Sequence, residues 1–106
     1  MGAAKQMTAA EVKAAIAAKG TLVVDFGATW CGPCQALAPH FEKMAGEFSG
    51  KATLVKIDID QESDLAGELG IMSVPTIMFF KDGAKVHQIL GNAPDQIRRK
   101  IIELAG

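Results

Sequence analysis

The chain has 106 residues, of which 49% are hydrophobic and 22% charged, a length and composition that fit one globular domain over residues 1–106. Its net charge of −1 argues against nucleic acid or an anionic membrane as the main partner. The longest apolar runs fall far short of the roughly 20 residues that a membrane span needs.

Two elements are predicted before the cysteines. Thr8 and Glu11 have the spacing of a capping box, which predicts a helix that starts at Thr8 and stops at Gly20. Residues 21–28 then form an apolar run with a single acid, which is typical of a strand buried on both faces. Residues 3–7 are a weaker candidate for a short edge strand.

A longer helix follows the cysteines. Its apolar residues repeat every three or four positions up to Phe48, and Pro39 inside it predicts a kink. Residues 52–58 predict a second buried strand, and residues 61–69 predict a short helix that Gly70 ends.

The rest of the chain predicts a hairpin and a final helix. Residues 76–81 and 84–90 have strand patterns on either side of a turn at Asp82-Gly83, and Pro94 opens the helix. Because strand and helix patterns alternate before the hairpin, we expect an α/β fold with one mixed sheet and helices on both of its faces. The residues expected in the core include Phe26, Leu37, Phe41, Met44, Phe79 and Phe80.

The two cysteines have a spacing that suits a redox pair. If Cys31 caps the following helix, Cys34 lies on its first turn and on the same face, about 5 to 6 Å away between Cα atoms, which a disulfide accepts. The helix terminus favours the thiolate of Cys31, so Cys31 should attack a substrate disulfide. Cys34, turned inward and more shielded, should then release the product. Gly32 allows close approach of a partner backbone, and Pro33 fits a helix start.

Structural zinc is the alternative use of two cysteines at this spacing. Zinc needs four ligands, and the chain offers only His40 and His87 besides the cysteines. Neither histidine has a spacing typical of a metal site, so we expect no metal here and assign both histidines to surface or packing roles.

Three short motifs of the sequence resemble those of a known family. The segments Val23-Val24-Asp25-Phe26, Trp30-Cys31-Gly32-Pro33-Cys34 and Ser73-Val74-Pro75-Thr76 occur in an order and spacing that resemble the thioredoxin family. The resemblance runs from about residue 8 to residue 104. It implies a thioredoxin fold, with one mixed sheet of about five strands and about four helices, and it implies no bound cofactor beyond the redox-active disulfide.

The resemblance also assigns roles beyond the cysteines. Burial should raise the pKa of Asp25, and in the family the acid at this position lies beneath the second cysteine and assists its deprotonation. A lysine of the neighbouring strand often helps it, and Lys56 fits that place. The family proline, here Pro75, is cis and packs against the cysteines, while the backbone of Val74 pairs with extended substrate.

An apolar docking surface that includes glycines is expected around the pair, and it would bind unfolded or extended chains with little sequence selectivity. For Met72, ordinary packing remains an alternative. The surface residues are Trp30, Gly32, Pro33, Ile71, Met72, Val74, Pro75, Gly91 and Asn92.

The sequence departs from the family pattern at one position near the site. Many members carry an aromatic residue, usually Trp, where Gly27 stands, which affects packing beside the cysteines. We expect altered stability or partner choice rather than loss of activity.

The implied function is a general protein disulfide reductase. A separate thioredoxin reductase, dependent on NADPH or ferredoxin, would recharge the pair, and the clients would be disulfide-containing proteins such as peroxiredoxins, ribonucleotide reductases or methionine sulfoxide reductases. We expect a cytoplasmic monomer, because residues 1–6 lack a secretory pattern, or an organellar protein if a transit segment was removed. The alternatives are an oxidant or isomerase on the same fold, and a binding module that works as a subunit or redox-gated inhibitor.

Overall fold

The structure of the chain is a computed structural model that describes residues 4–105. It contains five strands and four helices within those residues. In chain order the elements are β1 (Lys5–Gln6), α1 (Ala9–Ala17), β2 (Thr21–Gly27), α2 (Gly32–Glu47), β3 (Ala52–Asp58), α3 (Ser63–Glu68), β4 (Thr76–Lys81), β5 (Ala84–Leu90) and α4 (Pro94–Ala105).

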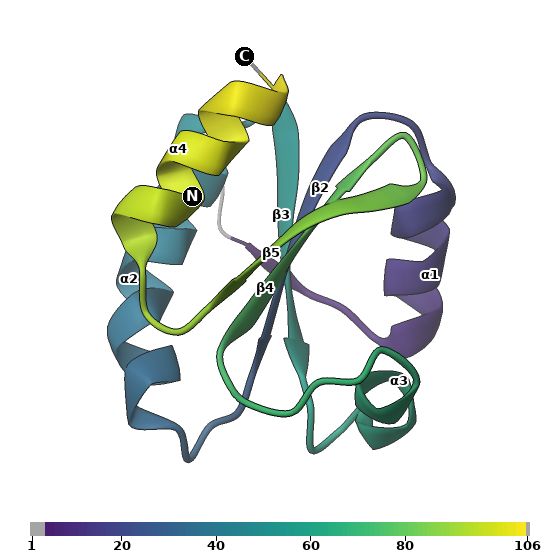
Figure 1. Cartoon of the computed structure of the whole chain (residues 1–106), viewed down its shortest axis with the longest axis vertical. Helices are drawn as coiled ribbons and strands as arrows, with labels where there is room; N and C mark the ends of the chain where they lie inside the picture. Colours follow the sequence, from purple (N-terminus) through teal and green to yellow (C-terminus); the bar gives the residue numbers. More distant parts are fainter. Residues whose placement is uncertain (1–3, 106) are drawn as a thin grey trace.

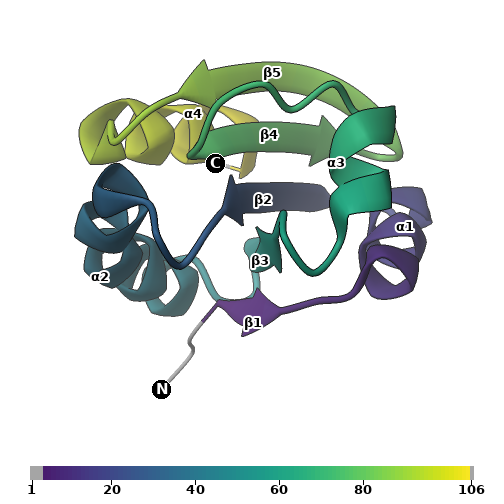
Figure 2. The same cartoon turned by 90° about the horizontal axis from the view of Figure 1, so that it is seen from below.

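The five strands form one mixed sheet with helices on both faces. The strand order is β1-β3-β2-β4-β5, with β1, β3 and β2 parallel and with β4 and β5 antiparallel to their neighbours. Helices α2 and α4 cover one face, and α1 and α3 cover the other (Figures 1 and 2). This is the α/β architecture that the alternating strand and helix patterns predict. Among residues 4–105, no helix is long and apolar enough to cross a membrane.

Each face of the sheet has its own hydrophobic core. Under α2 and α4, buried side chains such as Phe41, Phe79 and Ile101 pack together. Under α1 and α3, the core is built from residues such as Val12, Phe26 and Leu65. The six residues expected in the core are all buried: Phe26, Leu37, Phe41, Met44, Phe79 and Phe80.

The alternation of side chains along β2 determines where its single acid points. Val24 and Phe26 pack into the core under α1 and α3, whereas Val23 packs into the core under α2. Because successive strand residues face opposite sides, Asp25 shares the face of Val23 and lies under α2. The sheet register places Asp25 beside Lys56 of β3.

Two predicted helix ends are wrong. Gly20 has the predicted left-handed conformation, but helix α1 ends earlier than predicted, at Ala17. Gly20 donates its backbone N–H to the Asp82 side chain and accepts a backbone hydrogen bond from the Asp82 N–H. This contact with the β4–β5 turn pulls Gly20 away from the helix. Helix α3 begins at Ser63, later than predicted, because the N–H groups of the two preceding residues donate to the Asp58 carbonyl in a turn.

Other local predictions are confirmed. Thr8 and Glu11 form the capping box in both directions, at 3.2 and 3.0 Å. The turn residues Asp82 and Gly83 both have positive φ, as a tight hairpin turn requires. Of the weak edge strand at residues 3–7, the structure shows Lys5–Gln6, and residue 3 lies outside the described residues. Helix α2 runs through Pro39, and the kink there stays a prediction.

Helix α4 offers a test of the core through two adjacent isoleucines. Ile101 is fully buried, whereas Ile102 is 46% exposed. Replacing Ile101 with Ala should lower the free energy of unfolding by about 2–5 kcal/mol, because it removes packed methyl groups and leaves a cavity. The matched variant Ile102→Ala should change it by less than about 1 kcal/mol. Urea unfolding of both variants measures the difference, and equal losses would contradict this account of the core.

Candidate active site

The two cysteines form a disulfide at the start of α2. Cys31 is the N-cap of the helix, and its sulfur accepts a hydrogen bond from the backbone N–H of Cys34 at 3.2 Å. The Cα atoms of the pair are 5.2 Å apart, which matches the separation predicted from the spacing. The same N–H and the helix dipole would stabilise a thiolate on Cys31 after reduction.

The loop before β4 lies against Cys31. The Val74–Pro75 peptide bond is cis, as the family resemblance implies. The Val74 carbonyl is 3.7 Å from the Cys31 sulfur, and the Pro75 carbonyl accepts a bond from Gly91 N–H at 2.9 Å. The structure therefore brings together the α2 start, the proline loop and the end of β5, which are far apart in the sequence.

The relative burial of the two cysteines differs from the prediction. Cys31 as a residue is only 5% exposed, whereas Cys34 is partly exposed. Part of the reason is the contact of Cys31 with the Val74 loop. The other part is Gly27, which has no side chain to cover Cys34.

Asp25 is buried beneath α2 without a polar partner. The residue is 6% exposed, and its Oδ1 accepts no hydrogen bond within the described part of the chain. Loss of hydration raises the pKa of Asp25 to about 7, and the charge of Lys56 partly opposes this rise. Near neutral pH the carboxyl group can therefore both give and take a proton, as the sequence predicts.

Lys56 lies beside Asp25 but makes its ion pair elsewhere. Its ammonium group is 2.9 Å from a carboxylate oxygen of Glu42 on α2. Both side chains of this pair are about one-third exposed. Lys56 thus contributes a positive charge near Asp25 without satisfying its oxygen. No sequence pattern pointed to Glu42 as its partner.

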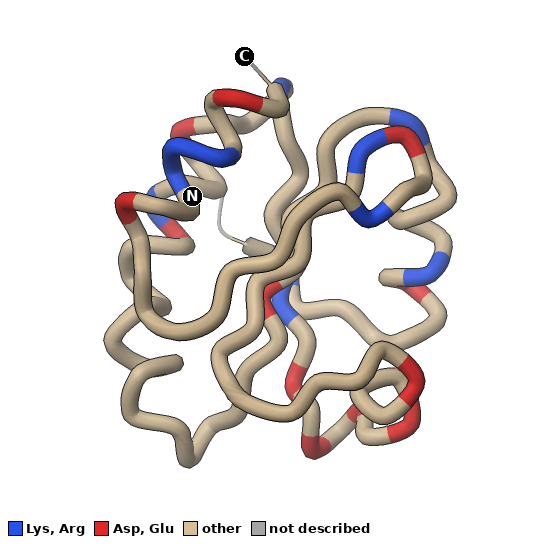
Figure 3. The backbone as a smooth tube through the Cα atoms, in the orientation of Figure 1, with Lys and Arg blue, Asp and Glu red and all other residues tan. Residues whose placement is uncertain are grey.

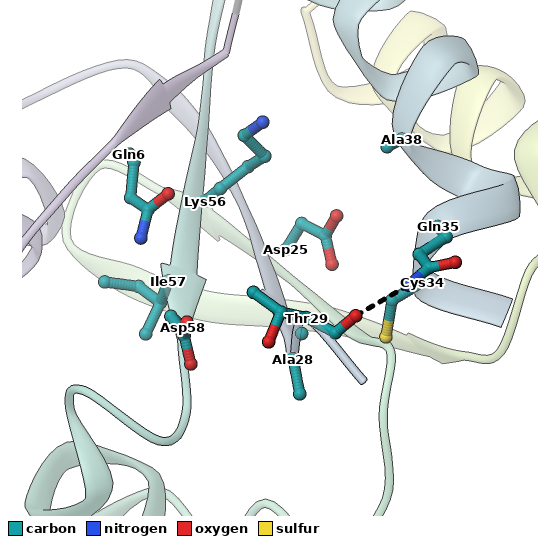
Figure 4. Close-up of a pocket in the computed structure, with 11 residues that line it drawn as sticks. Gln6, Asp25, Ala28, Thr29, Cys34, Gln35, Ala38, Lys56, Ile57 and Asp58 are labelled. Atoms are coloured by element: carbon teal, nitrogen blue, oxygen red, sulfur yellow. Dashed lines mark hydrogen bonds between the residues drawn. The ribbon is translucent and has the colours of Figure 1, made fainter. Parts of the chain in front are cut away.

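A cleft connects Asp25 with Cys34. Its volume is about 200 Å³, and Figure 4 shows Asp25 between Lys56 and Cys34 in the close-up. A Cβ atom built on Gly27 would lie 3.4 Å from the Cys34 sulfur and 3.7 Å from Asp25 Oδ1. The cleft thus extends into the space that a side chain at position 27 would fill. The lining residues are Gln6, Asp25, Gly27, Ala28, Thr29, Cys34, Gln35, Ala38, Lys56, Ile57 and Asp58.

The residues that make up the predicted docking surface carry no charge, although the Asp60 carboxylate contacts one edge of Trp30. No Lys, Arg, Asp or Glu occurs in residues 26–41, 69–80 or 86–94. In Figure 3 the start of α2 and the proline loop accordingly contain no red or blue segment. Met72 is 93% exposed and Trp30 is 66% exposed. Such exposure excludes core packing as the role of Met72, and its role in docking stays a prediction.

Trp30 has a partner that the sequence analysis missed. Its indole N–H donates to a carboxylate oxygen of Asp60, in the loop after β3, at 2.7 Å. The bond fixes one edge of the exposed ring beside Cys31. No periodicity could have revealed it, because the two residues are 30 positions apart and both lie in loops.

The histidines take the roles expected for them. The ring of His87 packs against Phe79 with centroids 5.7 Å apart, and His40 is exposed on α2. Within residues 4–105, no three His, Cys, Asp or Glu side chains are grouped so that they could hold a metal ion.

The comparisons with known proteins agree with this geometry. The family model described as Thioredoxin matches residues 3–103. A thioredoxin from Staphylococcus saprophyticus is 43% identical over 84 residues, which cover 79% of this chain and 81% of that protein. The solved structure of a thioredoxin from Malassezia sympodialis has a TM-score of 0.93 and 32% identity, and the match covers 100% of this chain and 94% of that one. A third match is a chain from a structural study of the thiol-resolving mechanism in yeast mitochondrial 1-Cys peroxiredoxin via glutathione/thioredoxin systems. Its TM-score is 0.88 with 32% identity, and the match covers 95% of both chains.

In this fold, a disulfide-bonded cysteine caps a helix and lies beside a cis proline. This arrangement defines the class of thiol–disulfide oxidoreductases. The family model covers nearly all of the sequence, and the relatives above carry the same name. The chain belongs to the thioredoxin family. The resemblance, the fold and the redox activity that the sequence implied are thereby confirmed.

The raised pKa of Asp25 predicts a pH-dependent stability. Between the ordinary value of 3.8 and about 7, the folded chain keeps a proton that the unfolded chain has released. The free energy of unfolding should therefore fall as pH rises through this window, by about 1.4 kcal/mol per pH unit and by about 4 kcal/mol in all. Above pH 7 this contribution levels off.

Asp25→Asn should remove this slope and leave the variant more stable than the wild type at pH 8. The exposed acid Asp64 provides the control, because Asp64→Asn should keep the slope. Denaturant unfolding of the oxidised proteins from pH 4 to 9 measures both. An unchanged slope in Asp25→Asn would show that Asp25 does not titrate in this window.

Proposed function

We propose that this thioredoxin-family protein is a general protein disulfide reductase that works as a monomer in a reducing compartment, the cytoplasm or an organelle. The observation that carries the proposal is the placement of Cys31 at the N-terminus of α2, within an uncharged docking surface. A thiolate there is stabilised by the helix terminus and is ready to attack. The broad, uncharged surface suits many extended chains.

In the proposed reaction, the thiolate of Cys31 attacks one sulfur of a client disulfide, and the other client sulfur leaves as a thiol. Cys34 then attacks the Cys31 sulfur of the mixed disulfide, which closes the Cys31–Cys34 bond and releases the second client thiol. Asp25 accepts the proton of Cys34 across the space beside Gly27. The Asp25 pKa of about 7 supports this exchange near neutral pH.

Electrons would come from a separate thioredoxin reductase that draws on NADPH or ferredoxin. A peroxiredoxin is one proposed client class, since a structure similar to this one comes from work on a 1-Cys peroxiredoxin resolved via glutathione/thioredoxin systems. Ribonucleotide reductases and methionine sulfoxide reductases are the others. All of these reactions need a dithiol that persists where thiols are kept reduced.

The kinetics of the two steps should separate the role of Asp25 from that of the cysteines. Asp25→Asn should slow release of the mixed disulfide by about a hundredfold, because the proton of Cys34 loses its acceptor. Formation of the mixed disulfide should change little, since it uses Cys31. Stopped-flow mixing with a protein disulfide resolves both steps, and equal effects on the two would remove Asp25 from the mechanism.

The redox potential of the pair tests the direction of the reaction. Trp30 is the only Trp, the chain has no Tyr, and Trp30 adjoins Cys31, so its fluorescence should follow the redox state of the pair in dithiol/disulfide buffers. We expect a potential below the cytosolic glutathione range. A clearly oxidising value would instead favour an oxidant or isomerase.

The non-redox alternative has its own test. A Cys31→Ser, Cys34→Ser double variant should fail to restore the function of a strain that lacks the protein. Full restoration would favour a binding module that uses only the fold.

A further inference from the structure

The two cysteines have different surroundings. Cys31 touches the Val74 loop and is surrounded by the docking surface. The lining of the cleft includes Cys34 but neither Cys31 nor any residue of that surface. The cleft is therefore a second approach to the redox pair. It reaches Cys34, whose sulfur lies beside the Gly27 position and is not the one that the proposed client reaction uses for attack.

Gly27 gives the cleft its inner end. Its φ lies outside the left-handed region, so the backbone conformation does not demand glycine. A Cβ atom there would be in ordinary contact with Cys34, at 3.4 Å from its sulfur. Any longer side chain would fill the space between Cys34 and Asp25, so the absence of a side chain at this position keeps Cys34 accessible.

The cleft is large enough to hold a small molecule. Its volume of about 200 Å³ admits a small molecule and is too small for a folded partner. Its charged lining consists of Asp25, Asp58 and Lys56. Because Lys56 is already paired with Glu42, Asp58 and the ionised fraction of Asp25 give the cleft a preference for a cation.

Asp25 supplies the second observation that points to a ligand. The residue is more than nine-tenths buried, lines the cleft and leaves Oδ1 without a hydrogen-bond partner among the described residues. A buried oxygen of this kind is costly unless something donates to it. A thiol S–H entering the cleft would bring a donor to this carboxyl group next to Cys34.

We propose that the Gly27 cleft admits a low-molecular-weight aminothiol, which attacks the sulfur of Cys34 and reduces the disulfide independently of the docking surface. The inference rests on the redox pair assigned to the family. It does not depend on which protein reductase or which clients are used.

The chemistry of this route balances with two thiols. Asp25 takes the proton of the first thiol, whose sulfur bonds to the Cys34 sulfur while the Cys31–Cys34 bond breaks. The electron pair goes to Cys31, which leaves as a thiolate stabilised by the α2 terminus and the Cys34 N–H. A second thiol then attacks the small-molecule sulfur of the adduct, giving a small disulfide and free Cys34. Two thiols are oxidised, and one protein disulfide is reduced.

The site of attack can be read directly. Oxidised protein is mixed with cysteamine and quenched at early times with excess iodoacetamide, and tandem mass spectrometry then locates the two modifications. The expected product carries cysteamine on Cys34 and the carbamidomethyl group on Cys31. The reverse pattern would overturn the proposal.

A second experiment tests the cleft itself and avoids reclosure of the disulfide. In a Cys31→Ser background, Cys34 is the only thiol, and its exchange with cystamine is the reverse of the proposed second step. Adding Gly27→Leu should slow this exchange at least tenfold, and Gly27→Ala should slow it a few-fold. The control Gly67→Ala, at an exposed glycine of α3 with open space around it, should leave the rate within twofold.

The charge preference gives a third readout in the same background. Each rate is divided by the rate of the same disulfide with 2-mercaptoethanol, which removes the effect of leaving-thiol acidity. On this scale cationic cystamine should react at least fivefold faster than anionic dithiodiglycolate, with neutral hydroxyethyl disulfide between them. An unchanged rate in Gly27→Leu, confirmed as folded by circular dichroism, or equal relative rates for the three disulfides would overturn the proposal. Gly27→Ala adds only a methyl group, so it still tests the proposal if Gly27→Leu does not fold.

The stopped-flow assay with protein disulfides measures attack by Cys31, whereas the cystamine assay measures exchange at Cys34. The proposed function and the proposed cleft can therefore fail independently.

Discussion

The site depends on one arrangement: the residue that caps α2 is also the first member of the redox pair. Cys31 satisfies the backbone N–H of Cys34 while it is bonded to the same residue through sulfur. The orientation of the helix start, the spacing of the sulfurs and the electrostatic stabilisation of a thiolate therefore follow from the same few atoms. The sheet contributes by placing the end of β2, the proline loop and the end of β5 around that point.

The buried acid under α2 shows how a functional group is kept at a cost to stability. Asp25 sits on the core-facing side of β2, where an apolar residue would pack more favourably. The charge of Lys56 compensates this cost only in part, because its ion pair is with Glu42. Gly27 leaves open the space beside the acid, so in the proposed reactions two positions of one strand set proton transfer and access.

Regular elements were predictable because their signals are local. The strands at residues 52–58, 76–81 and 84–90 match the prediction, since apolar runs end there at turn-forming residues. The end of α1 was not predictable, because Asp82 holds Gly20 from far along the sequence. The exposure of Cys34 was missed for a related reason: it follows from an absent side chain on another element, which no motif around the cysteines encodes.

The two edge strands of the sheet are poorly suited to pairing with another chain. Strand β1 has only two residues, and the pairing of β5 with β4 shifts register between Phe79 and Phe80. Short and bulged edges are poor templates for adding a further strand from another molecule. In the proposed function, an extended client would then be directed to the loops around Cys31 rather than to an edge of the sheet, where it could nucleate aggregation.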